Sequence, residues 1–183
     1  QLRDLARKAT AQHIAPIVAA DEESGRFRPE VIKELGALGL CGIHTSADLD
    51  GAGLGYLDYA IALEEMGAAS TAYAISVAVS GLPQVILSRF GTDAQKKKHI
   101  PPMARGEHIG AFALSESHSG SDAGALRAKA VKQGAHYVLN GTKLWCTQGN
   151  VASCLIVFAR TGGPGPKGIS AFIVEKGMAG LKV

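Results

Sequence analysis

The sequence is poor in aromatic side chains and in cysteine. Aromatic residues make up 5% of the 183 positions, and Trp145 is the single tryptophan. The three cysteines, Cys41, Cys146 and Cys154, are widely spaced, and no CxxC or His-x-x-His pair occurs. An odd count without paired spacing argues against a disulfide framework, and the missing pairs give a metal site little support. This usage favours a reducing compartment.

The sequence also lacks an excess of charge of one sign. Charged residues are 19% of the chain, the formal net charge is +3, and both signs are mixed along its length. The lysine run at residues 96–98 is more typical of a solvated helix face than of a phosphate-binding patch. We therefore expect no nucleic-acid partner. With 46% hydrophobic residues, the composition is that of a compact folded protein.

No targeting segment or membrane span is evident. The chain begins at Gln1 with charged residues and no apolar signal core, which suggests a sequence trimmed at its front. Residues 69–88 carry no charge, and by length alone they suggest a membrane span. Because Ser70, Pro83 and Gln84 dilute this segment, we expect a helix buried inside a bundle instead.

The alternation of strands and helices that a parallel α/β protein needs is absent. Up to residue 108, apolar residues recur at helical spacing, with a bend at Pro16 and a second helix opened by Pro29. A later helix begins with a capping box formed by Thr92 and Gln95. We predict an N-terminal all-α helical bundle over residues 1–108.

After residue 108 the apolar period becomes two. Gln133-Gly134 predicts a turn between two strands, and Asn140-Gly141 predicts a hairpin turn. We predict an antiparallel, β-barrel-like domain over residues 109–183, and hence an α+β fold with two domains. Five short strands can hardly close a barrel, and a final strand with no neighbour leaves an open edge. Either further chain follows or another piece completes the domain. The expected strands are residues 109–114, 127–132, 137–139, 155–159 and 169–174.

Two glycine-rich segments invite a nucleotide-binding interpretation. A dinucleotide fingerprint needs a strand before it and a helix after it in a βαβ unit. The segment at residues 51–55 follows a predicted helix, so we interpret it as a structural loop. The segment at residues 162–165 lacks the Gly-Lys-Ser/Thr ending of a P-loop and is interpreted as a connection between strands.

Two other segments are candidates for chemistry. Residues 112–122 leave a strand and enter a loop rich in small hydroxyls and glycine, which lets a phosphate approach the backbone. An ordinary serine-rich turn is the alternative. Residues 140–149 hold Trp145 and Thr147, which on a strand would share one face. A flat aromatic beside a hydrogen-bond donor could support a planar ring cofactor, whereas a buried barrel tryptophan is the alternative.

Together these segments resemble the acyl-CoA dehydrogenase flavoprotein family. Its middle domain carries A-x-T/S-E-P-x-A-G-S-D and then N-G-x-K-x-W-I-T, and the matching strings are ALSESHSGSD and NGTKLWCT. Residues 26–43 and 89–107 resemble two segments of its N-terminal helical domain, so the resemblance covers essentially the whole chain. Ser117 stands where the family usually has proline, and Cys146 where it usually has isoleucine.

The resemblance implies FAD as the cofactor, bound between the middle β domain and a C-terminal helical domain absent from this chain. Phe112 would wall the pocket, while the Leu114 N–H and the Ser115 hydroxyl would bind the flavin pyrimidine edge. Gly120 and Ser121 would meet the pyrophosphate, and Ser121 would also contact the CoA substrate. Trp145 would flank the isoalloxazine, Thr147 would bond near N5, and Cys146 would be a further cofactor-binding residue.

The implied reaction is α,β-dehydrogenation of an acyl-CoA to trans-2-enoyl-CoA, with hydride transfer to flavin N5. The family's base is a glutamate of the C-terminal domain, so we name no catalytic residue in this chain and do not promote Glu64, Glu65 or Glu116. An acyl-CoA oxidase, a flavin hydroxylase or a non-catalytic module that has lost flavin remain alternatives. The expected partners are acyl-CoA, electron-transfer flavoprotein and further copies of the chain, as a dimer or tetramer, in cytoplasm or mitochondrial matrix.

Overall fold

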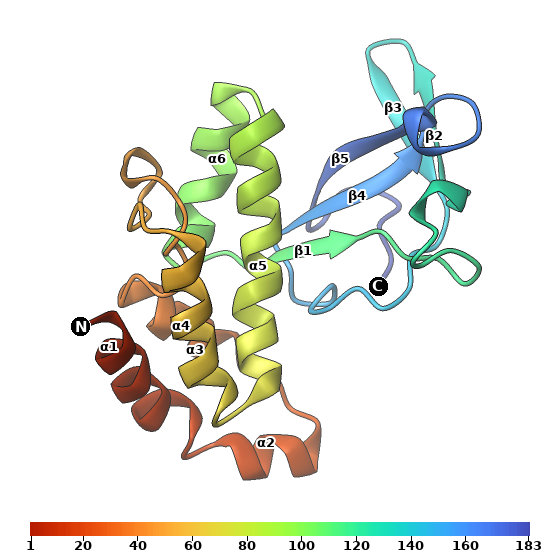
Figure 1. The fold of residues 1–183 in the computed structure, drawn as a ribbon. Helices are drawn as coiled ribbons and strands as arrows, with labels where there is room; N and C mark the ends of the chain where they lie inside the picture. Colours follow the sequence, from red (N-terminus) through yellow and green to blue (C-terminus); the bar gives the residue numbers. More distant parts are fainter. The chain divides into compact units, whose positions relative to one another are not determined.

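The computed structural model describes residues 1–183 as two compact units, Gln1–Gly110 and Ala111–Val183 (Figure 1). The first unit contains only helices, and the second contains the sheet. The predicted succession of a helical region and a β region is therefore confirmed. The helices are α1 (Leu2–Ala9), the π-helix η1 (Thr10–Ile14), α2 (Val18–Ser24), α3 (Pro29–Ala37), the 3-10 helix η2 (Ala47–Leu49), α4 (Tyr56–Gly67), α5 (Thr71–Phe90) and α6 (Asp93–Ala104).

The helix boundaries follow from local chemistry that the sequence displays. The chain breaks between η1 and α2, around Pro16, which has no backbone N–H to donate. Pro29 occupies the first turn of α3. At the start of α6, the Gln95 N–H donates to Thr92 Oγ1 (3.3 Å) and the Thr92 N–H donates to Gln95 Oε1 (2.9 Å), which is the predicted capping box.

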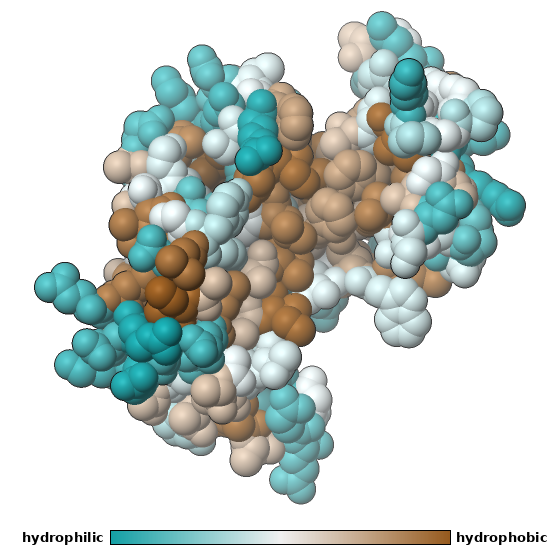
Figure 2. All heavy atoms as spheres, in the orientation of Figure 1, coloured by the Kyte–Doolittle hydropathy of each residue, from teal (hydrophilic) through white to brown (hydrophobic).

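Helix α5 forms the core of the first unit. Its buried residues include Tyr73, Val77 and Leu87. The buried Gln84 amide donates to the Cys41 carbonyl (3.0 Å) and accepts from the Thr45 hydroxyl (2.7 Å), so its polar atoms are satisfied. By length and composition α5 could cross a membrane, a test that core helices of other folded proteins also pass. Figure 2 shows hydrophobic residues gathered along this helix.

The sheet of the second unit is open, as expected for so few strands, but it is mixed, so the predicted purely antiparallel pairing is wrong. Strands β2 and β3 pair antiparallel, as do β4 and β5, but β2 meets β4 in parallel at Lys129 and Arg160. The strand order is β1-β4-β2-β3, with β5 also pairing with β4. The strands are β1 (Gly110–Ala113), β2 (Lys129–Gln133), β3 (His136–Asn140), β4 (Cys154–Arg160) and β5 (Ile169–Glu175).

The hairpin turn predicted at Asn140-Gly141 is also wrong. The turn predicted at Gln133-Gly134 is confirmed, because it connects β2 to β3 and Gly134 has a φ of 60°. Asn140 ends β3, and the chain continues as an irregular loop. Glycine is required at position 141 for a different reason. A Cβ there would lie 2.5 Å from the Ala128 Cβ, so the loop could not pass so close to the sheet.

Candidate functional site

The first candidate loop leaves β1 and is folded into a tight turn. Glu116 and Ser119 exchange backbone hydrogen bonds of 2.7 and 3.2 Å. The Ser119 hydroxyl donates to the Asp122 carbonyl (2.7 Å), and the 3-10 helix η3 (Ala123–Ala125) follows. The turn is therefore held by its own polar groups. Its outer residues, Gly120 and Ser121, remain exposed.

The second candidate loop, residues 141–149, contains no strand. The premise that Trp145 and Thr147 share one face of a strand is therefore wrong. Trp145 instead has a φ of 57°, a left-handed conformation that is a genuine outlier for a bulky residue. Its side chain is 91% exposed, so it is not a buried barrel tryptophan. Strained backbone of this kind persists where its surroundings hold it, and it is concentrated at functional sites.

The two loops lie side by side because residues of the second loop bind the first. The Lys143 ammonium donates to the Leu114 carbonyl (2.9 Å) and to Glu116 Oε1 (2.8 Å). The Leu144 N–H donates to the Ser115 carbonyl (2.9 Å). Segments that the sequence suggested as separate motifs therefore form one surface. The roles of Lys143 and Glu116 were missed, although both lie inside the two motifs.

Phe112 and Cys146 lie at the inner side of this surface. The Phe112 ring packs against Phe158 with centroids 5.0 Å apart. The Cys146 thiol donates to the Phe112 carbonyl (3.6 Å), and burial raises the pKa of this thiol. Cys146 also packs on the cluster of Ala111, Ala152 and Leu155. Both residues therefore support the loops from beneath, and the thiol is not poised as a nucleophile.

Three hydroxyls on the paired loops have no protein partner. Those of Ser115, Ser121 and Thr147 make no side-chain hydrogen bond within the chain. Gly120 has no atom within 4 Å of the position of a Cβ, so a bulky group can approach its backbone. An exposed indole, unpaired hydroxyls and an open glycine fit a ligand with both a planar ring and phosphates. The residues present therefore suit a flavin nucleotide.

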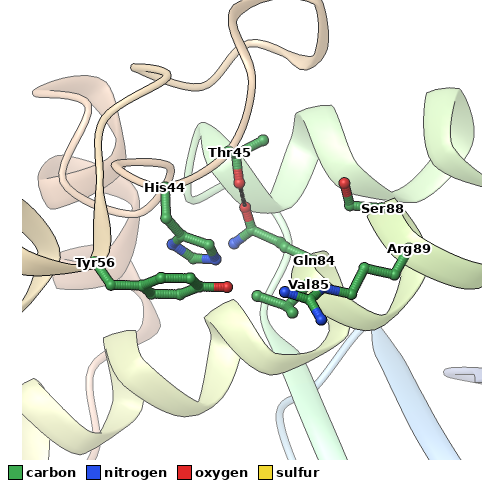
Figure 3. Close-up of a pocket in the computed structure, with 7 residues that line it drawn as sticks. All are labelled: His44, Thr45, Tyr56, Gln84, Val85, Ser88 and Arg89. Atoms are coloured by element: carbon green, nitrogen blue, oxygen red, sulfur yellow. Dashed lines mark hydrogen bonds between the residues drawn. The ribbon is translucent and has the colours of Figure 1, made fainter.

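The first unit contains a small pocket of its own (Figure 3). Its volume is about 70 Å³, and its lining residues are His44, Thr45, Tyr56, Gln84, Val85, Ser88 and Arg89. The His44 ring lies against Tyr56 and Tyr59, with centroids 5.7 and 4.7 Å apart. Burial lowers the pKa of His44, although the Gly81 carbonyl opposes this shift. The pocket has room for a few waters but not for a dinucleotide.

Comparison with known proteins identifies the chain's relatives. Residues 1–107 match the model of the acyl-CoA dehydrogenase N-terminal domain, and residues 111–183 match that of the middle domain. The chain belongs to the acyl-CoA dehydrogenase family. Members of this family are oxidoreductase flavoproteins of fatty-acid or amino-acid catabolism, and a tetramer is typical of them.

Two curated relatives cover nearly all of the chain. It is 44% identical to mitochondrial isovaleryl-CoA dehydrogenase of Pongo abelii, over 99% of this chain and 44% of the relative. It is 40% identical to the short-chain specific acyl-CoA dehydrogenase of Clostridium acetobutylicum, over 100% of this chain and 48% of the relative. The chain thus spans about half the length of the curated relatives it matches.

Solved structures of acyl-CoA dehydrogenases share the fold. Butyryl-CoA dehydrogenase of Megasphaera elsdenii matches with a TM-score of 0.93 and 34% identity, over 98% of this chain and 48% of the other. A glutaryl-CoA dehydrogenase of Mycobacterium smegmatis in complex with FADH2 matches with a TM-score of 0.91 and 31% identity, over 98% of this chain and 45% of the other. A chain from a study of the electron transferring flavoprotein of Acidaminococcus fermentans matches with a TM-score of 0.94 and 37% identity, over 98% of this chain and 48% of the other.

Proposed function

We propose that this chain forms the N-terminal and middle parts of an FAD-dependent acyl-CoA dehydrogenase that converts an acyl-CoA thioester to trans-2-enoyl-CoA. The observation that carries the proposal is Trp145. Trp145 has a left-handed backbone conformation and is 91% exposed. Its loop, residues 141–149, is hydrogen-bonded to the loop that contains Ser115. A non-glycine residue in the left-handed region costs about 1–3 kcal/mol, and strain of this kind is concentrated at active sites and ligand-binding sites.

In this proposal the paired loops bind and orient the cofactor. The Trp145 indole supports one face of the isoalloxazine, and the Ser115 hydroxyl binds its pyrimidine edge. Gly120 and Ser121 receive the pyrophosphate, with Ser121 also contacting CoA. Thr147 donates toward N5. When bound, the flavin supplies the acceptor for the hydride that leaves the substrate's β carbon. Donors fixed in advance at that edge stabilise negative charge as it develops there.

Glu64, Glu65 and Glu116 all take part in ion pairs, so none of them is proposed as the acceptor of the α proton. Glu116 is engaged by Lys143, and Glu65 by Arg3 and Arg7. Glu64 forms an exposed ion pair with Arg3 (3.1 Å). The resemblance to the family implies a base in its C-terminal domain, so we propose that the base lies in a part of the protein outside these 183 residues. Hydrogen bonds to the thioester carbonyl make the α proton acidic enough for a carboxylate to remove.

The names of the relatives suggest substrates and partners to test. Isovaleryl-CoA and butyryl-CoA are the first candidates, because dehydrogenases so named are similar to this chain. Electron-transfer flavoprotein is the proposed electron acceptor, and a homo-oligomer is the proposed assembly. Since relatives include mitochondrial and bacterial enzymes, the matrix or the bacterial cytoplasm is the proposed location.

The test is to purify the full-length protein that carries this chain and to measure flavin per chain by visible absorbance. A stoichiometric flavin that acyl-CoA reduces without oxygen supports the proposal. Slow reoxidation in air then indicates a dehydrogenase, and fast reoxidation indicates an oxidase. A colourless protein that binds no added FAD would contradict flavin chemistry and favour a non-catalytic module.

A further inference from the structure

The loops of the candidate flavin site are joined by a buried ion pair between Glu116 and Lys143. Their charged groups lie 2.8 Å apart, and the side chains are only 6% and 10% exposed. Neither group faces solvent as an ordinary surface pair does. A surface pair contributes little to stability, whereas removing one partner of a buried pair leaves a charge without compensation.

Glu116 connects the first loop to the sheet as well as to the second loop. Its Oε2 accepts from the Arg127 N–H (2.7 Å), and its Oε1 accepts from the Ala128 N–H (2.9 Å). Burial alone would raise the pKa of this carboxyl, but Lys143 and the two amides outweigh burial and hold the pKa below its ordinary value. Glu116 is therefore a carboxylate with three donors within 3 Å. His118 Nε2 lies 3.6 Å away as a fourth polar neighbour.

Lys143 fixes the second loop directly before its strained residue. Its ammonium binds the Leu114 carbonyl and Glu116, and the next residue, Leu144, donates to Ser115. Trp145 follows immediately with its φ of 57°. These contacts are made through backbone carbonyls and the Glu116 carboxylate, so the Ser115 hydroxyl is left without a partner in the chain. The same bonds therefore hold the two loops in register and leave the Ser115 hydroxyl unpaired.

We propose that Glu116 and Lys143 are positioning residues, which set the distance between the Ser115 edge and the Trp145–Thr147 edge of the flavin site. The proposal rests on the function proposed above. Neither residue is among those proposed to contact the flavin. Both act through the loop backbones, so their loss alters how the flavin is held and how fast it is reduced, in addition to any loss of stability.

The helical unit offers a matched control for stability. The half-buried Arg28 and the buried Asp21 form another ion pair, with 2.8 Å between Arg28 Nη2 and Asp21 Oδ1 and side-chain exposures of 26% and 5%. Arg28→Met removes a cation from this pair as Lys143→Met does from the other. Arg28 lies outside the site, so its loss lowers the melting temperature and leaves the flavin spectrum and reduction rate unchanged.

The experiment compares Lys143→Met, Lys143→Arg and Arg28→Met in the full-length protein. Each is measured for melting temperature, flavin absorption spectrum, FAD affinity, and the rate of reduction by isovaleryl-CoA or butyryl-CoA. Lys143→Met is expected to shift the spectrum, to weaken FAD binding at least threefold and to slow reduction at least tenfold. Lys143→Arg keeps a cation that can donate hydrogen bonds, so it should recover part of the FAD affinity and part of the reduction rate.

The outcomes separate the two proposals. If Lys143→Met loses stability as Arg28→Met does but keeps the wild-type spectrum and reduction rate, the positioning role is overturned while the flavin function stands. If wild-type protein binds no flavin, the proposed function fails whatever the variants do. Should Lys143→Met not fold, Glu116→Gln decides by the same measurements, because it keeps the size and removes the charge.

Discussion

The Nε of Arg28 lies 2.8 Å from Oδ1 and 2.9 Å from Oδ2 of Asp21, so one arginine nitrogen is shared by both carboxylate oxygens. The Tyr73 hydroxyl donates to the same carboxylate at 3.0 Å. Three segments of the helical unit, α2, the start of α3 and α5, therefore meet at one buried acid. Their meeting point makes the stability of this unit depend on pH.

Acid should weaken the helical unit through Asp21. The Arg28 hydrogen bond lowers the pKa of Asp21 below 3.8, the ordinary value. A lowered folded-state pKa stabilises the fold at pH values above the unfolded pKa, and this contribution is lost as the pH falls through the folded pKa. Urea denaturation at several pH values should therefore show stability falling below about pH 4.

The control for this effect is Asp21→Asn, which keeps the shape but cannot ionise. Its stability should depend less on acidic pH than that of the wild type. Some dependence should remain, because Arg7 lowers the pKa of Glu65 and the Glu116 pKa is also lowered. Equal pH dependence in the variant and the wild type would show that Asp21 does not carry the effect.

Gly51 should tolerate no side chain. A Cβ there would overlap the Thr45 carbonyl, which belongs to the backbone and cannot move aside cheaply. Gly51→Ala should destabilise the protein by about 1–3 kcal/mol, as overpacking usually does. Gly67→Ala is the matched control, because it lies in α4 and its Cβ would have an ordinary contact of 3.8 Å with Ala74. It should stabilise by about 0.4–1 kcal/mol, and similar losses in both variants would contradict the loop geometry.

Trp145 should matter for flavin binding and not for folding. Because its indole is 91% exposed, Trp145→Ala removes little buried surface. The melting temperature of the flavin-free protein should stay unchanged. Loss of an aromatic stack of roughly 0.5–1.5 kcal/mol should weaken FAD binding by about two- to tenfold, measured by flavin fluorescence titration. A large drop in apoprotein stability with unchanged affinity would place the indole inside the fold instead.

Thr147 should affect chemistry more than binding. Thr147→Val keeps the shape and removes the donor proposed for N5. A neutral hydrogen bond contributes about 0.5–1.5 kcal/mol in ordinary settings, and a donor aimed at developing charge contributes up to roughly 3 kcal/mol. Each 1.36 kcal/mol is about a factor of ten in rate. Flavin reduction by acyl-CoA should slow by about ten- to a hundredfold with little loss of FAD occupancy. Rapid mixing measures the rate, and an unchanged rate at full occupancy would mean that Thr147 does not face N5.

The sequence predicted what depends on local chemistry. The capping box at Thr92, the helix start at Pro29 and the change of period near residue 108 each rest on residues close in the chain, and the structure contains them. The parallel contact of Lys129 with Arg160 could not be predicted in this way, because pairing between distant strands has no local signal. The prediction of a turn at Gly141 was wrong because glycine is needed there for close packing of the loop against Ala128.

The candidate site also combines features that have a local signal in the sequence with features that have none. The two loops of the candidate site were predicted from their hydroxyls, glycine and tryptophan, and from the resemblance of two motifs. The conformation of Trp145 was missed, since a tryptophan in the left-handed region is contrary to the local preference of that residue. The link between Glu116 and Lys143 was missed because it joins residues 27 positions apart. Only tertiary structure shows that one motif fastens the other.

The most direct test of the account is anaerobic mixing of the full-length protein with isovaleryl-CoA or butyryl-CoA while the visible flavin absorbance is followed. Oxidised flavin should be bound, its absorbance should bleach on mixing, and the corresponding enoyl-CoA should appear in equal amount. A protein whose bound flavin keeps its full absorbance with both thioesters, and forms no enoyl-CoA, would contradict it.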